Sequence, residues 1–141
     1  MRTDPRRREA DAYPWIAQVA TRFGDMDVNR HLNNVAVARL YEEVRVRFNG
    51  HLRTLHDLQP HYLVGHVAID YLGEGRYPLP ATIGYGIASF GRASFRAAMA
   101  MFQNGRCIGL CDTVMVYRGD AGPAPIPEVV RAMLGEWTLR P

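Results

Sequence analysis

Residues 23–35, FGDMDVNRHLNNV, hold two carboxylates, one histidine and three asparagines in thirteen positions. The segment follows residues 15–23, where apolar and polar side chains alternate as they do in a half-buried strand. It precedes a run of apolar residues at helical spacing that begins at Val35. A turn or a helix cap needs only one or two such polar residues. Their density therefore indicates a functional site where a strand passes into a helix.

The run from Val35 to Phe48 predicts the one long helix of the chain. Apolar residues recur in it at steps of three or four, and arginine and glutamate fill the positions between them, so one stripe is buried. Asn49-Gly50 is a typical helix stop, and we expect the helix to end there. The unpaired N–H groups and the positive dipole end of its first turn point back toward residues 25–31.

Four further strands are predicted after a polar connection over residues 51–60. They cover residues 61–72, 78–90, 93–103 and 106–118. Short turn signals suit hairpins between them, at Gly73-Glu74-Gly75, Gly91-Arg92 and Asn104-Gly105, and a short helix is expected at residues 128–134. An antiparallel sheet wrapped on the long helix, an α+β fold, buries the apolar face of each. Between Thr82 and Ala88 one strand face is unusually small, and we expect a helix or a ligand chain to approach it closely.

The size and charge of the chain limit its organisation and partners. A length of 141 residues predicts a single domain over residues 13–141, preceded by a solvated, mobile tail over residues 1–12. A formal net charge of +3 argues against nucleic acid as a partner. No stretch approaches the ~18 apolar residues of a membrane span, and no secretory signal precedes the domain. We therefore expect a cytoplasmic protein with neither nucleic-acid nor membrane partners.

Neither the two cysteines nor four of the five histidines show the spacing of a cofactor site. Cys107 and Cys111 share one predicted strand, ~13 Å apart, so they cannot form a disulfide with each other. Asp112 interrupts the apolar positions of that strand, which favours a structural ion pair or hydrogen bond over a functional role. The other histidines recur every five residues, a spacing that matches no metal motif: His51, His56, His61 and His66. We expect neither a metal nor another cofactor.

Residues 22–34 follow the pattern R-[FY]-x-D-x-D-x-x-x-H-[VL]-N-N. In this they resemble the hotdog-fold thioesterases, in the branch of 4-hydroxybenzoyl-CoA thioesterase, bacterial acyl-CoA thioesterases and plant acyl-ACP thioesterases. The resemblance covers roughly residues 15–118. It implies a five-stranded antiparallel sheet wrapped around a long central helix. It also implies hydrolysis of an acyl-CoA to a free acid and CoA.

The resemblance assigns the chemistry to two positions. The second aspartate of the motif, Asp27, corresponds to the nucleophile or general base. The backbone N–H at the helix start corresponds to Asn34 and would polarise the thioester carbonyl, so the helix N-terminus acts as an oxyanion hole. From the residues alone, Asp25, Asp27 and Asn29 are each also explained as turn or cap residues.

Four further positions are implied to orient or bind the substrate. The N-x-H-x-N-N part of the motif assigns a catalytic role to His31 and substrate contacts to Asn29 and Asn33. A lone histidine is otherwise more often structural. Arg92, in a turn before Ser-Phe, resembles the basic residue that meets the CoA phosphates, and its alternative reading is a solvated hairpin arginine.

The resemblance further implies a homodimer or a tetramer in which two sheets join edge to edge. The site would lie where the helix entry of one subunit meets the sheet of its partner. Such pairing would also cover the edge that a lone five-stranded sheet leaves open. Two other functions stay open: hydrolysis of an acyl group carried by acyl carrier protein, and acyl-CoA binding without catalysis. The sequence leaves the acyl length open.

Overall fold

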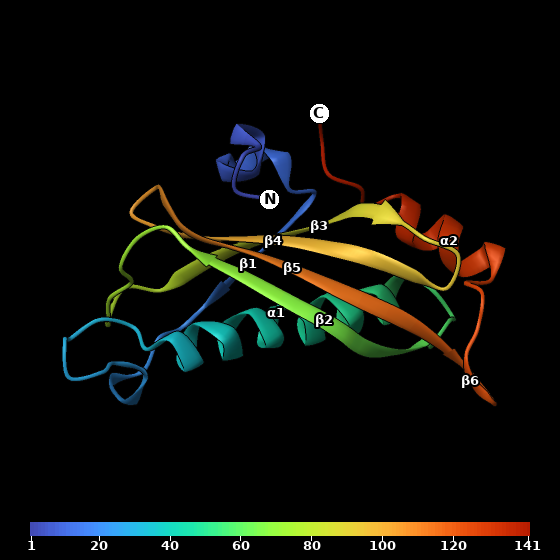
Figure 1. Ribbon diagram of the computed structural model, residues 1–141, viewed down its shortest axis with the longest axis horizontal. Helices are drawn as coiled ribbons and strands as arrows, with labels where there is room; N and C mark the ends of the chain where they lie inside the picture. The colour runs from blue at the N-terminus through green and yellow to red at the C-terminus, as the bar shows by residue number, and fades with distance from the viewer.

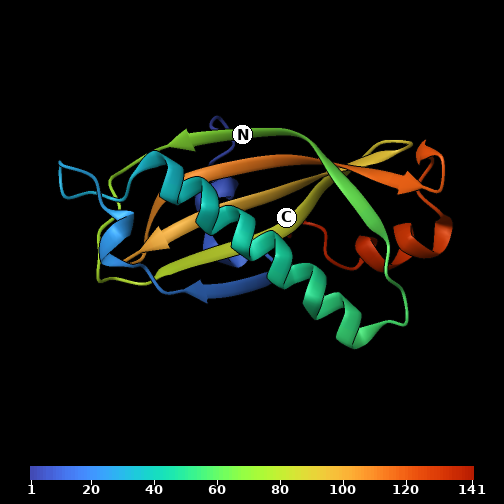
Figure 2. The ribbon, with the colours of Figure 1, turned by 90° about the horizontal axis from the view of Figure 1, so that it is seen from below.

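The computed structural model describes residues 1–141 and shows one long helix laid against a curled antiparallel sheet (Figure 1). The helix, α1 (Asn34–Leu55), crosses in front of the sheet in Figure 2. The strands are β1 (Trp15–Val19), β2 (His61–Tyr71), β3 (Ala81–Phe90), β4 (Ser94–Gln103), β5 (Arg106–Gly119) and β6 (Gly122–Pro123). They lie in the order β1-β3-β4-β5-β2, and β6 pairs only with β5. The predicted α+β hotdog architecture is confirmed.

Strand β1 ends at Val19, before the end at residue 23 that the sequence pattern predicts. Its partner β3 begins at Ala81, which pairs with Val19. The residue before it, Pro80, has no backbone N–H to continue the ladder. Residues after Val19 are therefore free to enter the loop that leads to α1.

Helix α1 continues beyond Asn49-Gly50 to Leu55, so the prediction that it stops there is wrong. Leu52 lies one turn after Phe48 on the buried stripe and is itself buried. A glycine inside a helix costs about 1 kcal/mol relative to alanine, whereas burying a leucine side chain gains about 1.5–3 kcal/mol. Burial therefore outweighs the local stop signal.

The core lies between α1 and the inner face of the sheet. Phe48 of α1 stacks on Tyr85 of β3, with ring centroids 4.1 Å apart. Its edges meet Trp15 of β1 and Trp137, which follows α2 (Glu128–Gly135). These contacts join the start, the middle and the end of the chain in one cluster, so α1 has a fixed position against the sheet.

The small face of β3 lies on the outer side of the sheet and is covered by the ends of the chain. A Cβ on Gly84 would lie 2.5 Å from the Tyr13 ring, and one on Gly86 would lie 2.8 Å from Leu139. The close approach predicted there is real, but neither a helix nor a ligand chain makes it. Terminal side chains fill the space that the sequence left open for a ligand.

Residues 1–12 form two short 3-10 turns, η1 (Pro5–Arg8) and η2 (Ala10–Ala12), on the side of the sheet opposite α1 (Figure 1). The expectation of a solvated tail is wrong for Arg7, which is only 5% exposed. Its Nη2 lies 2.7 Å from Asp112 Oδ1, so Asp112 forms a structural ion pair, as its position in β5 predicts. Arg96 approaches the other oxygen of Asp112 at 3.6 Å.

The two ends of the chain meet on this outer side. The Arg140 N–H donates to the Ala12 carbonyl at 2.8 Å, and Arg6 Nε donates to the Pro141 carbonyl at 3.0 Å. Both turns are therefore held by the last residues of the chain as well as by the sheet.

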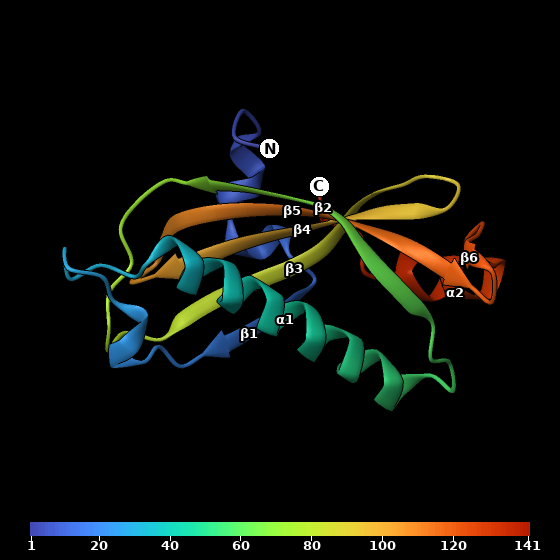
Figure 3. The same ribbon diagram turned by 60° about the horizontal axis from the view of Figure 1, so that its bottom comes forward.

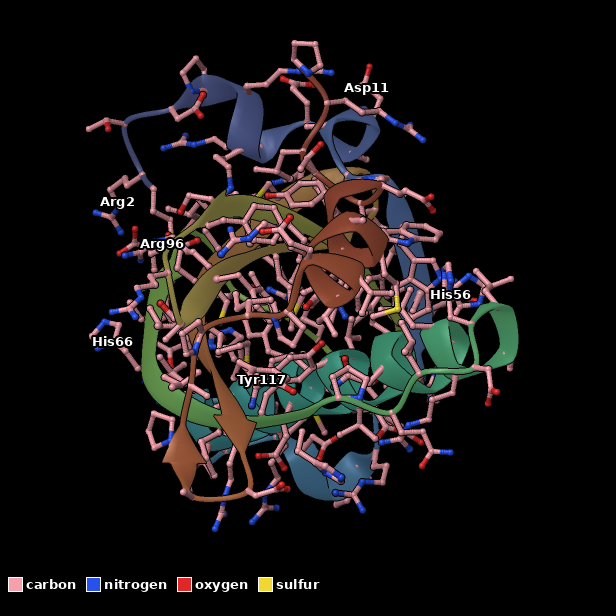
Figure 4. All side chains as sticks on the ribbon, turned by 90° about the vertical axis from the view of Figure 1, so that its right-hand side faces the viewer. Arg2, Asp11, His56, His66, Arg96 and Tyr117 are labelled. Carbon is pink, nitrogen blue, oxygen red and sulfur yellow. The ribbon has the colours of Figure 1, made fainter.

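No helix in the structure is both long and apolar enough to cross a membrane. No three His, Cys, Asp or Glu side chains are grouped so that they could hold a metal ion. Figure 4 shows His56 and His66 on opposite sides of the molecule, and His51 instead stacks on Trp15. Both cysteines are free thiols.

Candidate active site

The loop between β1 and α1 is fixed by Asp25, the first aspartate of the motif. This residue is buried at the end of a 3-10 turn, η3 (Phe23–Asp25). Its carboxylate accepts a hydrogen bond from the Arg22 N–H at 2.8 Å and pairs with the Arg22 guanidinium at 3.2 Å. Its backbone carbonyl accepts from the Asn33 N–H at 2.8 Å. Asp25 therefore joins the start of the loop to the helix cap.

Asp27 uses only one of its two carboxylate oxygens inside the chain. Oδ1 accepts from the Asn29 N–H at 2.8 Å and lies 3.5 Å from the His31 N–H. The Asp27 N–H donates to the His31 carbonyl at 2.9 Å, which closes the loop, and Arg30 takes a left-handed φ of 62° at its tip. Oδ2 has no hydrogen-bond partner in the chain and is free to act on a ligand.

Helix α1 begins with a capped turn in which the N–H groups of Asn34 and Ala36 have no acceptor. The Asn33 side chain accepts from the Val35 N–H at 2.7 Å, so Asn33 is the helix cap. The next N–H, that of Asn34, has no acceptor in the chain. Because it lies in the first turn of a 22-residue helix, the positive end of the helix dipole adds to this donor.

A pocket of about 200 Å³ brings the three predicted catalytic residues together. Asp27, His31 and Asn34 line its polar side. Its apolar side is lined by Leu32, Val37, Met101 and Ile108. Tyr71, at the end of β2, also lines it and lies 3.4 Å from the Asn34 carbonyl through its hydroxyl. The pocket thus joins a carboxylate, a free helix N–H and an apolar surface.

Glu74 is a pocket residue that sequence reasoning missed. Its Oε2 lies 2.9 Å from His31 Nε2, and the two side chains are 62% and 28% exposed. The sequence indicated only a turn at Gly73-Glu74-Gly75. The link between β2 and β3 covers residues 72–80, whereas the predicted strands left only residues 73–77 between them, within the range of an ordinary hairpin, so no local signal pointed to Glu74.

Gly75 allows this link to pack against the loop. The Leu32 N–H donates to the Gly75 carbonyl at 2.8 Å. A Cβ on Gly75 would lie 2.7 Å from Leu32 Cδ1 and 3.1 Å from Ile108 Cδ1. The absence of a side chain therefore brings Glu74 within reach of His31.

The three predicted substrate-binding residues, Asn29, Asn33 and Arg92, do not line the pocket within one chain. Asn29 is exposed at the loop tip, where its N–H supports Asp27. Arg92 lies in the turn between β3 and β4, at the end of the sheet opposite the loop of residues 23–33 (Figure 3). Arg131 of α2 holds this turn by donating to the Gly91 carbonyl at 2.7 Å.

Three larger hollows, of about 550, 500 and 440 Å³, are also present on the surface. The first runs between the end of β1 and α1 and is lined by side chains of both charges, among them Arg39 and Glu43. The second lies beside η2 and the start of β3. The third is lined by Asp27 together with Phe23, Met26 and Arg30. Neither His31 nor Asn34 lines any of the three, and only the smaller pocket brings both of them together with Asp27, so it is the candidate active site.

The fold, together with the family to which the chain belongs, defines the class of the protein: a hotdog enzyme that hydrolyses thioesters. The chain belongs to the thioesterase-like superfamily, which it matches over residues 21–134. This match includes the whole loop, α1 and the strands from β2 to β6.

Solved structures share this fold. A thioesterase from Thermus thermophilus, complexed with coenzyme A and zinc, is 27% identical with a TM-score of 0.81, covering 92% of this chain and 98% of that one. A predicted thioesterase from Bacillus stearothermophilus is 25% identical with a TM-score of 0.80, covering 90% and 98%. A gentisyl-coenzyme A thioesterase, 18% identical with a TM-score of 0.73 and covering 85% and 99%, shows the shared fold alone. No curated protein sequence matches the chain.

Proposed function

We propose that the protein is an acyl-CoA thioesterase that releases a free acid and CoA, with Asp27 and the start of α1 as its catalytic groups. The observation that carries this proposal is that a free carboxylate oxygen and a free helix N–H belong to residues that line one pocket. The relative from Thermus thermophilus, which is complexed with coenzyme A, supports a CoA thioester as the substrate.

In this mechanism the thioester oxygen accepts a hydrogen bond from the Asn34 N–H. As the carbonyl carbon is attacked, this oxygen becomes negative, and one such donor contributes ~3–4 kcal/mol in the transition state. Asp27 Oδ2 either attacks the carbon, giving an anhydride that water hydrolyses, or takes a proton from the attacking water. In both cases the carbon–sulfur bond breaks and the thiolate of CoA leaves and is protonated.

The His31–Glu74 pair is a second group able to move a proton in this pocket. A carboxylate that accepts from Nε2–H holds the imidazole in one tautomer and leaves Nδ1 as a proton acceptor. We propose that this pair positions the water and returns the proton to the leaving thiolate. Asn29 keeps a supporting role through its N–H, and Asn33 keeps its predicted substrate contact through its side-chain NH₂.

A homodimer formed through the edge of β2 is part of the proposal. This strand is at the end of the sheet order and exposes apolar side chains at Leu63, Val64 and Val67, each between 43% and 49% exposed. An eleven-residue apolar edge with open backbone groups is a template for pairing with a second chain. A tetramer would need a further contact between two such dimers.

This dimer would also bring Arg92 toward a pocket. Leu63 of β2 and Ser94 of β4 pair with the same residue of β5, so the turn that carries Arg92 lies near the start of β2. Antiparallel pairing of two β2 strands sets the start of one beside the end of the other, where Tyr71 lines the pocket of Asp27. Arg92 would then meet the CoA phosphates from the partner subunit.

The free thiols Cys107 and Cys111 support the expectation of a cytoplasmic, reducing compartment. They are the only observation in the structure that bears on location.

The experiment that tests the proposal measures thiol release from a panel of acyl-CoA thioesters. We expect turnover by the natural chain, and a kcat lower by ~100-fold for Asp27→Asn with the oligomer unchanged in light scattering. Equal turnover by both proteins would contradict the role of Asp27. Faster release of the same acyl group from acyl carrier protein would favour that carrier, and tight acyl-CoA binding without thiol release would favour a binding module.

A further inference from the structure

The hydroxyl of Tyr41 is one of three buried side-chain polar atoms without a hydrogen-bond partner, the others being the Tyr62 hydroxyl and the Trp137 indole N–H, and the proposed mechanism uses none of them. Tyr41 is 0% exposed, and its hydroxyl has no hydrogen-bond partner. Burial raises the pKa of this hydroxyl well above its ordinary value, so it stays protonated at neutral pH. A buried hydroxyl without a partner is destabilising, and its persistence calls for a reason in the neighbouring structure.

The neighbour of this hydroxyl is Gly109 of β5. A Cβ on Gly109 would lie 2.8 Å from Tyr41 Oη, so the hydroxyl occupies the space that a side chain would take. Gly109 pairs with Tyr71 of β2 on one side and with Met101 of β4 on the other. Directly paired residues project to the same face of a sheet, so the three positions form a row facing α1.

The two outer members of this row, Tyr71 and Met101, both line the pocket of Asp27. On the helix side Val37 lines the same pocket, and Tyr41 follows it by four residues on the same face of α1. Tyr41 therefore lies behind the pocket, one helical turn beyond Val37 along α1. On the sheet side, its hydroxyl contacts the row at Gly109, between Tyr71 and Met101. Tyr41 does not itself line the pocket, and its buried side chain fills the layer of the core behind Val37 and Met101.

We propose that Tyr41, seated on Gly109, closes the acyl end of the site and restricts the enzyme to short acyl groups. This inference rests on the proposed function and names its substrate class. The pocket volume of about 200 Å³ is below the ~300–1,000 Å³ of most ligand pockets. A pocket this small suits acyl groups of a few carbons rather than long chains, and we expect a preference for about four to six.

The test uses acyl-CoA thioesters from two to sixteen carbons and compares kcat/KM for each. We expect the natural chain to prefer about four to six carbons. Tyr41→Ala should shift this preference to longer chains and raise the octanoyl-to-butyryl ratio of kcat/KM by ~10-fold or more. Tyr41→Phe is the matched control, because it keeps the ring and removes only the hydroxyl, and it should leave the ratio within about twofold.

Gly109→Ala tests the same contact from the strand side. Its methyl group would displace the Tyr41 hydroxyl toward the pocket, so the preferred acyl group should become shorter. This variant decides the inference if Tyr41→Ala does not fold. A natural chain that prefers twelve to sixteen carbons, or a folded Tyr41→Ala with an unchanged chain-length profile, would overturn the inference.

Binding separates a failure of this inference from a failure of the proposed function. Alkyl-CoA thioethers cannot be hydrolysed, so calorimetry with chains of graded length reads the size of the site without catalysis. If no acyl-CoA releases thiol, the proposed function fails, and the limit set by Tyr41 is still supported by thioether affinity that falls beyond about six carbons. Affinity that rises steadily to sixteen carbons in the natural chain would refute the limit.

Discussion

Asp27 in the loop and Asp112 on the outer face of β5 show two opposite uses of a carboxylate. Both oxygens of Asp112 are engaged, one by the buried Arg7 at 2.7 Å and one by Arg96 at 3.6 Å. Asp27 holds its turn with Oδ1 alone and leaves Oδ2 without a partner. Complete pairing is typical of a group that stabilises the fold, and incomplete pairing at a pocket is typical of a group that acts on a ligand.

Among these predictions, substitution of Asp112 should have the largest effect on the free energy of unfolding. Asp112→Ala should lower the free energy of unfolding by about 3–5 kcal/mol, because it leaves Arg7 buried without a counter-ion. Urea denaturation measures this loss. Arg96→Ala is the control and should cost below about 1 kcal/mol, since its side chain is 44% exposed. A loss for Asp112→Ala as small as that of the control would contradict the structural role.

Alkaline pH should destabilise the fold from the core face of β5, the face opposite Asp112. Burial raises the pKa of Cys111, which faces the core beside Asp112, to about 11 from an ordinary value near 9. Stability from this thiol is therefore complete below about pH 9 and is lost as the pH rises through about 11, a loss of about 3 kcal/mol. Burial also raises the pKa of Tyr85, which adds to the loss at still higher pH.

Denaturation curves at pH 8 and pH 11.5 would measure this dependence. Cys111→Ala should reduce the difference between the two curves, because it removes one of the groups that titrate. A natural chain equally stable at both values would show that these buried groups do not govern the alkaline limit.

Asp27→Asn should lower the catalytic rate and leave the stability of the fold nearly unchanged. We expect kcat to fall by ~100-fold, about 2.7 kcal/mol, with a change in unfolding free energy below about 1 kcal/mol. Asp25→Asn is the matched variant in the same motif. Because Asp25 is buried and bonded to Arg22, this variant should lose stability by about 1–3 kcal/mol. Equal stability losses at the two positions would remove the distinction between them.

Glu74→Gln should give the smallest effect, about a 10-fold fall in kcat with KM little changed, since Glu74 acts only through His31. Steady-state kinetics would measure it. Glu128→Gln, at the start of α2, is a control that should leave kcat unchanged. A fall as large as that for Asp27→Asn would make the His31–Glu74 pair the principal base.

Local sequence patterns were sufficient for most of the secondary structure. The alternation of side chains gave the strands, and Asn104-Gly105 marked a tight turn that the structure forms with φ angles of 50° and 73°. The end of α1 was misjudged at Asn49-Gly50, because the burial of Leu52 depends on the sheet beneath it. The covering of Gly84 by Tyr13 joins positions far apart in the chain, and no local pattern encodes it.

The candidate site was predictable where the motif is continuous. Asp27, His31 and Asn34 lie within eight residues, and the turn that joins them is local. Glu74 reaches His31 only because the β2–β3 link folds back onto the loop, with Leu32 against Gly75. The sequence also could not show that Asp27 keeps one oxygen free, since this depends on which backbone N–H groups the folded loop aims at it.

The meeting of the chain ends on the outer side of the sheet has a practical consequence for measurements on this protein. Arg6 touches the carbonyl of Pro141, on the side of the sheet opposite α1. A biotin or fluorophore attached at the C-terminus would therefore stand apart from both the β2 edge and the loop of Asp27, whereas the N-terminus lies beside the end of β2, where Arg2 approaches Asp70 and the Tyr71 carbonyl. Surface immobilisation through a C-terminal group should leave ligand entry and subunit exchange unhindered.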